Sequence, residues 1–405
     1  MFALAGALTA CGDVAKAPGR SDNDAGEMTS DAGEMTSDAG ATTTDAGATD
    51  SVRIETHSLS VGSVQVSVPF SNGNGIHLAD VPVTVHTENG QLYAVRWTTT
   101  PTRVPIDQRV GGMTLAGKGD HLLVVYVSLE GNELRLREST DGGRTWSSAH
   151  SLGARPTGPA LPTACVYDAN GQRRKALAWS HQPSESEGPL VIAQDDGSGW
   201  KLPVTHTSIA SSGAALYCAD GASPQIVWRD HRYKASGGPV VLYTATIDSA
   251  GNLTQSSQIM DRAYDPGFCG YGPYRFVSYH DDIAQAFLAR SEDDGASYTP
   301  IDVDSTQSGT QPFDDSGKYV SVGCSSELLV ATWGDWPTKQ EAQTRASTRH
   351  LGMALSRDHG HTWVAARPAG DRDNLGPTTI SVSGGTAYLL WPAPGELWIA
   401  EVSLH

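Results

Sequence analysis

Short apolar runs that end in an aromatic residue recur along most of the chain. Each run is followed by a polar cluster, and the chain shows little sign of amphipathic helix. Short apolar runs bounded by polar or glycine-rich turns are typical of buried β-strands. The aromatic landmarks are Trp97, Tyr126, Trp179, Trp228, Tyr279, Trp333 and Trp391. These landmarks predict seven copies of one supersecondary unit.

The two ends of the chain are predicted to complete one repeat together. Residues 58–68 alternate apolar and polar side chains, as a strand with one covered face does. The last repeat, residues 378–404, has room for three strands only. We expect residues 58–68 to supply its missing strand, which removes exposed sheet edges. The gap from Trp97 to Tyr126 is short for a complete unit, so six repeats remain an alternative to seven.

One octapeptide occurs twice, as Ser-Thr-Asp-Gly-Gly-Arg-Thr-Trp at 139–146 and as Ser-Arg-Asp-His-Gly-His-Thr-Trp at 356–363. Weaker copies at 193–200 and 291–298 keep the Asp, a Gly two residues later and the closing aromatic; residues 246–251 hold a fainter trace. The repeated aspartates are Asp141, Asp195, Asp248, Asp293 and Asp358. Their period of roughly 50 residues belongs to four-stranded propeller blades.

The octapeptide has the composition of a tight hairpin. Its Asp can accept hydrogen bonds from backbone N–H groups two residues on and from a Ser or Thr hydroxyl, and Gly supplies a positive φ. The closing Trp or Tyr would pack between sheets. The pattern resembles the Asp box, or BNR repeat, of sialidases and other Asp-box propellers. This resemblance implies an all-β, six- or seven-bladed β-propeller, seven preferred, with structural boxes between third and fourth strands, away from the active site.

The amino terminus predicts an exported lipoprotein. Residues 1–11 form a short apolar segment that ends in Leu-Thr-Ala-Cys, which resembles a bacterial lipobox with Cys11 as the acylated residue. The resemblance implies a lipid-anchored protein of the cell envelope, at the outer membrane or cell surface of a Gram-negative bacterium. No Lys or Arg precedes the apolar segment, and a translation start upstream of Met1 would supply one. A chance run of small residues before a cysteine is the alternative.

Residues 12–56 are predicted to be a disordered acidic linker. Four seven-residue units fill residues 24–51, each with a Gly and none with the apolar pair of a coiled coil. Calcium binding is a weaker alternative, since the EF-hand spacing is absent. We expect this linker to hold the propeller, residues 57–405, away from a membrane that the protein contacts through its lipid anchor only.

The charge balance narrows the class of partner. With 405 residues and a formal net charge of −17, the chain lacks the clustered Lys and Arg that phosphate contacts need. We expect no nucleic-acid partner, no cofactor and a monomer.

Four cysteines are spaced like the repeats themselves. Cys165, Cys218, Cys269 and Cys324 stand 53, 51 and 55 residues apart, so each falls on the innermost strand of consecutive blades. In an exported protein an even count favours disulfides. Three connectivities are possible. We favour the neighbouring pairs Cys165–Cys218 and Cys269–Cys324, provided that their Cα atoms lie about 4.4–6.8 Å apart. A ring of thiolates around a soft metal is the alternative, although C-x-x-C spacing is absent.

Chemistry-bearing residues gather in the turns after the aromatic landmarks. Alternate turns of an up-and-down blade emerge on opposite faces, so these turns would converge at a propeller mouth opposite the boxes. Such groups could transfer protons, bind a sugar acid or hold a cation; the alternative is that they merely pair with one another in solvated turns. The candidates are His181, Arg229, Asp230, His231, His280, Asp281, Asp282, Asp335 and Trp336, with Arg155, Arg262 and Asp265 in connections on the same face.

The resemblance to sialidases covers architecture better than catalysis. It implies an Arg-Ile-Pro step in the first blade, whose Arg grips the substrate carboxylate, but the matching position here is Asp80. A carboxylate there would repel a sialic acid. Arg103 comes too late to replace it. Tyr271, Tyr274 and Glu327 are available for the tyrosine nucleophile and its glutamate partner, without a clear match.

These observations are compatible with two main hypotheses about function. We expect a lipid-anchored envelope protein whose propeller binds an extracellular glycan or protein ligand. The alternative is a sialidase-like glycoside hydrolase that uses Asp230 or Asp281 as acid or base. A scaffold without a small ligand is a third possibility.

Overall fold

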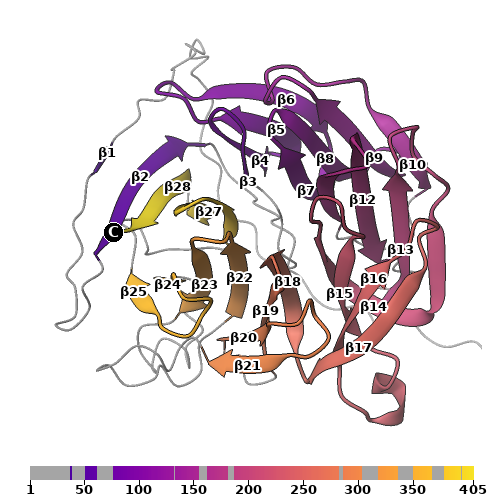
Figure 1. The fold of residues 1–405 in the computed structure, drawn as a ribbon. Helices are drawn as coiled ribbons and strands as arrows, with labels where there is room; N and C mark the ends of the chain where they lie inside the picture. Colours follow the sequence, from indigo (N-terminus) through magenta and orange to yellow (C-terminus); the bar gives the residue numbers. More distant parts are fainter. Residues whose placement is uncertain are drawn as a thin grey trace, which may run out of the picture. The chain divides into compact units, whose positions relative to one another are not determined.

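The computed structural model describes residues 37–38, 51–61, 76–131, 133–154, 162–180, 187–281, 286–302, 318–335, 350–366, 378–393 and 395–405. Within these ranges the regular structure is β-strand, apart from the short 3-10 helix Lys234–Ser236. The described strands form six antiparallel sheets arranged around a common axis (Figure 1). The prediction of an all-β propeller is confirmed.

Four of these sheets contain four strands each, hydrogen-bonded in chain order. The first contains β3 (Ile76–Leu78), β4 (Pro82–Glu88), β5 (Gln91–Arg96) and β6 (Thr102–Gln108), and the second contains β7 (Val110–Lys118), β8 (His121–Ser128), β9 (Glu133–Ser139) and β10 (His150–Ala154). The third contains β18 (Tyr264–Tyr271), β19 (Tyr274–His280), β20 (Ala286–Ser291) and β21 (Thr299–Asp302). The fourth contains β22 (Lys318–Cys324), β23 (Leu329–Asp335), β24 (His350–Ser356) and β25 (Val364–Ala366).

The fifth sheet joins the two ends of the chain. Its order is β1 (Ser37–Asp38), β2 (Val52–Ser60), β28 (Glu396–Leu404), β27 (Thr386–Ala393) and β26 (Thr379–Ser383). In Figure 1 the indigo β2 runs beside the yellow β28, in register from Val52 with Leu404 to Ser60 with Glu396. The closing strand thus lies earlier than the predicted 58–68, and regular pairing begins before residue 57, because Ile54, Thr56 and Ser58 turn inward and pack. Residues 62–75 lie outside the described ranges.

The sixth sheet corrects the predicted count of six or seven separate blades. Five sheets have the size of one blade, whereas β11 (Thr163–Ala169), β12 (Gln172–Ser180), β13 (Gly188–Asp195), β14 (Val204–Tyr217), β15 (Gln225–Asp230), β16 (Val241–Ile247) and β17 (Leu253–Asp261) form one continuous seven-stranded sheet. The reason is the long strand β14, whose beginning pairs with β13 and whose end, after a register shift, pairs with β15. Gly213 at this register shift does not end the strand, and no Pro lies between the two halves, so no gap separates the two groups.

Apolar side chains fill the spaces between neighbouring sheets. Residues Leu122–Val127 in the middle of β8 are buried, because sheets cover both faces of that strand. One cluster joins the β3–β6 sheet to the β7–β10 sheet, and another packs the β11–β13 part of the long sheet onto its β15–β16 part around the fully buried Trp228. The first strands contact one another in a closed circle, from β3 through β7, β11, β14, β18, β22 and β26 back to β3.

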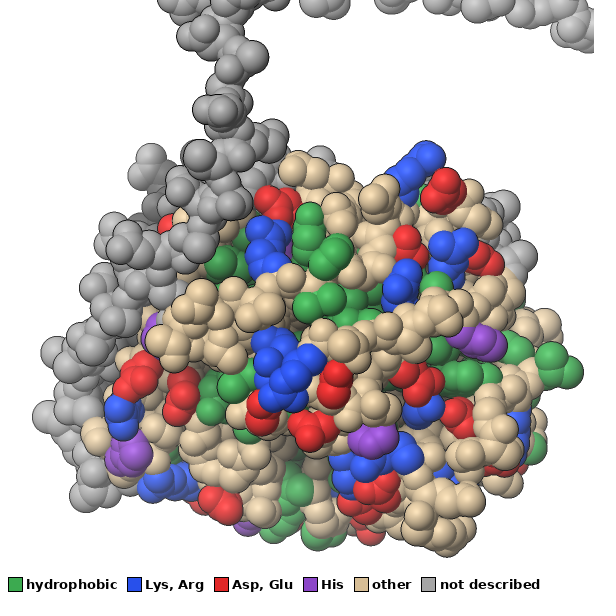
Figure 2. Space-filling view, turned by 90° about the horizontal axis from the view of Figure 1, so that it is seen from above, with side chains coloured by type: hydrophobic (Ala, Val, Ile, Leu, Met, Phe, Trp, Pro, Cys, Tyr) green, Lys and Arg blue, Asp and Glu red, His purple; other side chains and the backbone are tan. Residues whose placement is uncertain are grey.

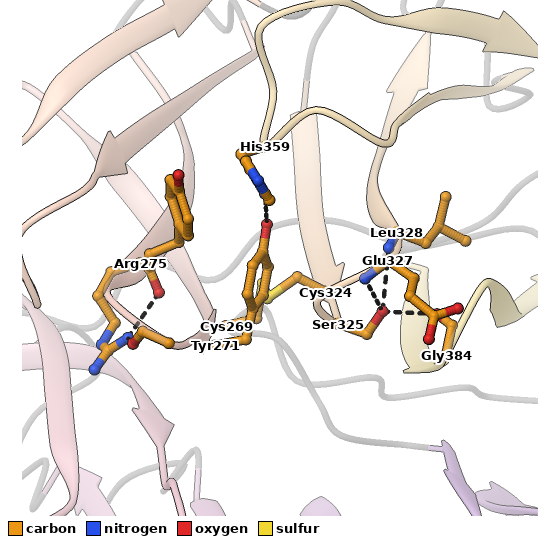
Figure 3. Close-up of a disulfide and its surroundings, with 11 residues drawn as sticks. Cys269, Tyr271, Arg275, Cys324, Ser325, Glu327, Leu328, His359 and Gly384 are labelled. Atoms are coloured by element: carbon orange, nitrogen blue, oxygen red, sulfur yellow. Dashed lines mark hydrogen bonds between the residues drawn. A yellow bond between two sulfur atoms is a disulfide. The ribbon is translucent and has the colours of Figure 1, made fainter.

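Two disulfides join neighbouring strands of this inner circle. Cys165 on β11 is bonded to Cys218 just after β14, and Cys269 on β18 is bonded to Cys324 on β22, with Cα separations of 6.0 and 5.9 Å. The favoured pairing is confirmed, because repeated positions on adjacent inner strands come within bonding distance. Beside Cys324, Ser325 accepts hydrogen bonds from the amides of Glu327 and Leu328 and donates to the carbonyl of Gly384 in the next sheet (Figure 3).

Candidate functional site

The two ends of the propeller carry different kinds of turn. One end, here called the turn face, carries the turns between first and second and between third and fourth strands of each group. The other end, the mouth face, carries the turns between second and third strands and the entries into the inner strands. All five repeated aspartates lie in third-to-fourth connections and therefore on the turn face.

The aspartates of the turn face are satisfied within their own octapeptides. Asp141 accepts hydrogen bonds from the Ser139 hydroxyl at 2.8 Å and from the Thr145 amide and hydroxyl at 2.9 and 2.6 Å. Asp293 and Asp358 repeat this arrangement. Hydrogen bonds to the charged carboxylate lower the pKa of Asp141 and of Asp293 to about 2. These groups hold their turns through bonds within the octapeptide.

The residue matched to the sialidase arginine also lies on the turn face. Asp80, in the β3–β4 hairpin, pairs with Arg96 at 2.7 and 2.9 Å and with Arg144 of the neighbouring octapeptide. The Arg96 hydrogen bond lowers the pKa of this carboxyl. The match to the sialidase arginine implied that Asp80 would face the mouth. It does not, because the short hairpin places it at the opposite end.

The tyrosine candidates are placed in the same way. The Tyr271 hydroxyl lies 2.6 Å from His359 Nδ1 (Figure 3). The Tyr274 ring stacks on that imidazole. Burial raises the pKa of Tyr271 to about 12. Glu327 lies in the β22–β23 hairpin at this end. These side chains stabilise contacts between neighbouring sheets.

At the mouth face, side chains from two strand groups meet in an ion-pair chain. Arg229, near the end of β15, donates from Nη1 to Asp265 Oδ1 at 2.9 Å. His280, at the end of β19, lies with Nε2 3.2 Å from Asp265 Oδ2. Side-chain exposures of 20, 18 and 15 % for Arg229, Asp265 and His280 leave part of each group open to solvent. We call these three residues, together with Tyr264, Ser212, His231 and Glu187, the mouth cluster.

An aromatic surface lies beside the ion pairs. The Tyr264 ring stacks on His280 with 5.4 Å between centroids and 15° between planes, and the Arg229 guanidinium lies 5.6 Å from its centroid. Arg262 and Asp265, which flank this tyrosine, have φ of 54° and 51°. Left-handed backbone costs free energy in residues other than glycine and clusters at functional sites. The entry into β18 is therefore strained while it positions Tyr264 and Asp265.

A second branch of the mouth cluster surrounds His231. Its Nε2 lies 2.6 Å from Ser212 Oγ and 3.1 Å from Arg229 Nε, and its Nδ1 lies 3.3 Å from Glu187 Oε2. Arg229 Nε also donates to Ser212 Oγ. Burial, together with the positive charges of Arg229 and Lys234, lowers the pKa of His231 to about 4, so its imidazole is neutral near pH 7. Burial likewise lowers the pKa of Arg229.

Asp230 has a different environment from its neighbours. Its side chain is 0 % exposed and accepts hydrogen bonds from the Arg232 amide at 2.9 Å and from Trp228 Nε1 at 3.1 Å, beside the Arg232 guanidinium at 2.8 Å. These bonds hold the turn after β15. Asp281 is half-buried beside His280, whose Nδ1 lies 2.8 Å from the Asp281 carbonyl.

The structure thus brings together Arg229, His231, Asp265 and His280 among the residues expected at the mouth. Asp335 ends β23, where only its backbone is described. Outside the described ranges lie Cys11, Arg155, His181, Asp282 and Trp336.

Three members of the mouth cluster had not been expected, namely Glu187, Ser212 and Tyr264. Ser212 and Tyr264 lie upstream of Cys218 and Cys269 at the mouth ends of the inner strands. The cysteine register could therefore have found both. Glu187 carries no comparable signal, because only the fold brings it to His231.

Charge elsewhere on the described surface is dispersed. Figure 2 shows acidic and basic side chains interspersed with hydrophobic ones over the face it displays. Among the described residues no group of three or more His, Cys, Asp or Glu side chains could hold a metal ion. Nor is any helix in those ranges long and apolar enough to cross a membrane.

Solved structures of sialidases and of a lectin are similar to this chain. A Trypanosoma rangeli sialidase in complex with the inhibitor DANA shares 11% identity over 86% of this chain and 59% of its own, with a TM-score of 0.47. The fucose-specific lectin of Aleuria aurantia shares 13% identity over 70% of this chain and 88% of its own, with a TM-score of 0.46. No family model and no curated protein matches the chain. At these identities and TM-scores the likenesses carry no argument about function, which we infer from the mouth cluster.

Proposed function

We propose that the chain is a glycan-binding module whose ligand sits at the mouth cluster. The observation that carries this proposal is the partly exposed chain of Arg229, Asp265 and His280 beside the Tyr264 ring. Sugar hydroxyls both donate and accept hydrogen bonds, and their C–H faces pack on aromatic rings. A guanidinium, a carboxylate and an aromatic ring held together by their own contacts meet both needs without rearrangement.

The charge of the cluster favours a neutral sugar over an acidic one. Asp265 neutralises Arg229, and the acidic residues Glu187 and Asp281 lie in the same region of the mouth as the basic residues Lys234 and Arg262. His231 and its low pKa contribute no positive charge near pH 7. With these charges balanced, the cluster holds no net positive charge that would attract a carboxylate.

A glycan array tests this proposal on the full chain. We expect saturable binding to neutral glycans that falls about tenfold or more in Tyr264→Ala and Asp265→Asn, a loss of at least about 1.4 kcal/mol. Arg173→Gln is the control, because it removes an ion pair with Asp168 that lies on the turn face, away from the mouth cluster. Binding that is lost equally in Arg173→Gln, or unaffected in Tyr264→Ala, would place the ligand elsewhere.

A sialidase-like glycoside hydrolase is the second candidate, and the carboxylates Asp265 and Asp281 at the mouth favour it. Fluorogenic glycosides, including a sialoside, separate the two functions. Turnover that disappears in Asp281→Ala would support the hydrolase. Asp230→Ala is a weaker test, because the buried, fully bonded Asp230 cannot reach a substrate without unfolding its turn.

We also propose that Cys11 is lipidated and that the acidic linker tethers the module at the cell envelope. The motif supports this location, and the disulfides are of the kind found in exported proteins. Cys11→Ser should move the protein from the detergent phase to the aqueous phase in Triton X-114 partitioning. Unchanged partitioning would contradict lipidation.

A further inference from the structure

Three side chains of the mouth cluster lie in the order serine, histidine, carboxylate, which sugar binding does not require. Ser212 Oγ lies 2.6 Å from His231 Nε2, and His231 Nδ1 lies 3.3 Å from Glu187 Oε2. They come from three places in the chain: the middle of β14, the turn after β15 and the residue before β13. A nucleophile, a base and a group that orients the base are recognised by this mutual geometry rather than by sequence order.

The hydrogen-bond pattern assigns the proton positions. The Ser212 hydroxyl accepts from Arg229 Nε, so its own hydrogen is available to donate to His231 Nε2. His231 then carries its hydrogen on Nδ1, the atom that faces Glu187. Within the described ranges, His231 Nδ1 and Glu187 Oε2 form no aligned hydrogen bond, so each has unused bonding capacity toward the other. Catalytic hydrogen bonds are often this long before a substrate is bound.

We propose that Ser212 is the nucleophile of an ester hydrolase, with His231 as its general base and Glu187 as the group that orients the base. In the first step Ser212 Oγ attacks the ester carbonyl carbon while its proton moves to His231 Nε2. The tetrahedral intermediate then collapses, the C–O bond to the alcohol breaks, and the alcohol leaves with the proton from His231. Water attacks the acyl-serine with His231 again taking a proton, and the carboxylic acid leaves as that proton returns to Ser212 Oγ.

In this reaction Arg229 has a second role besides its ion pair with Asp265: it stabilises the negative charge that develops in the intermediate. Its Nε donates to Ser212 Oγ, so the guanidinium lies beside the oxygen that would attack the ester. Fixed N–H donors near a developing oxyanion are usually a large contribution to rate. The same positive charge helps to keep His231 neutral and able to accept a proton.

The burial of Ser212 and His231 limits the substrate class. Ser212 and His231 are 5 and 6 % exposed, so a short acyl group can reach the hydroxyl more readily than a long chain. We therefore assign esters of small acyl groups, such as acetyl esters, to this site. The reaction goes beyond the proposed function, because ester cleavage at Ser212 does not depend on whether the alcohol is a sugar.

The experiment uses the full oxidised chain, a fluorophosphonate probe and 4-methylumbelliferyl acetate. We expect the probe to label Ser212, as mapped by mass spectrometry, and we expect turnover of the acetate ester. Ser212→Ala and His231→Gln should each lower kcat/KM by about 100-fold or more, and Glu187→Gln by about tenfold or more. Ser211→Ala is the matched control, because Ser211 is the adjacent buried serine and bonds Ser180 instead.

Several results would overturn the proposal. They are a folded wild-type chain that neither labels at Ser212 nor cleaves the ester, wild-type turnover in Ser212→Ala, and undiminished labelling in His231→Gln. Labelling of the wild type requires no substitution, so a misfolded variant cannot hide the answer. Glycan binding by Ser212→Ala is measured in parallel; a chain that cleaves esters but binds no glycan would refute the proposed function alone.

Discussion

The two faces of the propeller use the same residue types in opposite ways. On the turn face, Asp141 and its counterparts Asp293 and Asp358 bond hydroxyls and amides within four residues along the chain. On the mouth face, Asp265 bonds Arg229 and His280, of which the first is 36 residues away in sequence. A carboxylate satisfied by its own turn stabilises the fold. A carboxylate shared between strand groups holds its charged neighbours in place and leaves them partly exposed.

This difference also separates how the two faces respond to protons. Hydrogen bonds to the charged form hold the pKa of Asp141 near 2, so the turn face keeps its negative charge well into acid. Burial and positive neighbours hold the pKa of His231 near 4, so this imidazole stays neutral near pH 7 beside the charged Arg229. The aspartates of the turn face thus stay charged, whereas His231 of the mouth face stays neutral.

The largest effect on stability is expected from the disulfides, which belong to neither face. Replacing both Cys165 and Cys218 with Ser opens a 53-residue loop and should lower the free energy of unfolding by about 3–4 kcal/mol. Urea unfolding followed by tryptophan fluorescence measures this, with the Cys269 and Cys324 double variant as a parallel. A loss below about 1 kcal/mol for both pairs would show that the closed ring holds the inner strands without them.

The next largest effect is expected on the turn face. Asp141→Ala removes three hydrogen bonds to a charged group and should lower the free energy of unfolding by about 2 kcal/mol, with glycan and ester assays unchanged. Thr140→Ala, in the same turn, is the control. A change in ligand binding in Asp141→Ala would mean that the two faces are coupled.

Acid should destabilise the two faces in different ranges of pH. The pKa of His231 in the folded chain lies below its ordinary value of 6.5. Its neutral imidazole therefore contributes to the free energy of unfolding above about pH 6.5, and this contribution is lost as the pH falls to about 4. Arg229, Lys234, Asp230 and Glu187 are the charged groups near it. The folded pKa of Asp141 lies below 3.8, so its contribution is lost between about pH 4 and pH 2.

Unfolding in urea at a series of pH values checks this. His231→Gln should flatten the upper range and leave the lower one, whereas Asp141→Asn should flatten the lower one. Two variants with the same profile would refute the separation of the two faces.

The smallest effect on stability is expected at the aromatic surface of the mouth. Tyr264→Ala loses the stack on His280 and should cost less than about 1 kcal/mol of unfolding free energy, since the ring is only half-buried. Tyr264→Phe should keep both the stack and glycan affinity. A destabilisation by Tyr264→Ala as large as that of Asp141→Ala would make this ring a structural element like the turns.

The sequence predicted those features that repeat with the blades. The spacing of Cys165, Cys218, Cys269 and Cys324 was enough to predict two disulfides, because equal positions on adjacent inner strands must lie close together. Separate blades were predicted where β14 runs on without a break, because no local signal distinguishes a bent continuous strand from two strands. Asp80 was matched to a family position by a short motif that carries no information about which face its hairpin points to.

The sequence by itself determined the propeller, its disulfide pairs and the bonds within its turns, because each depends on residues close together in the chain or repeated at one period. Only the tertiary structure decided that Asp230 is buried in its turn while Asp265 is shared between Arg229 and His280. Only the fold, too, brought Glu187, Ser212 and His231 into one line. Their approach depends on how neighbouring strand groups pack and bend, and no pattern along one strand encodes that distance.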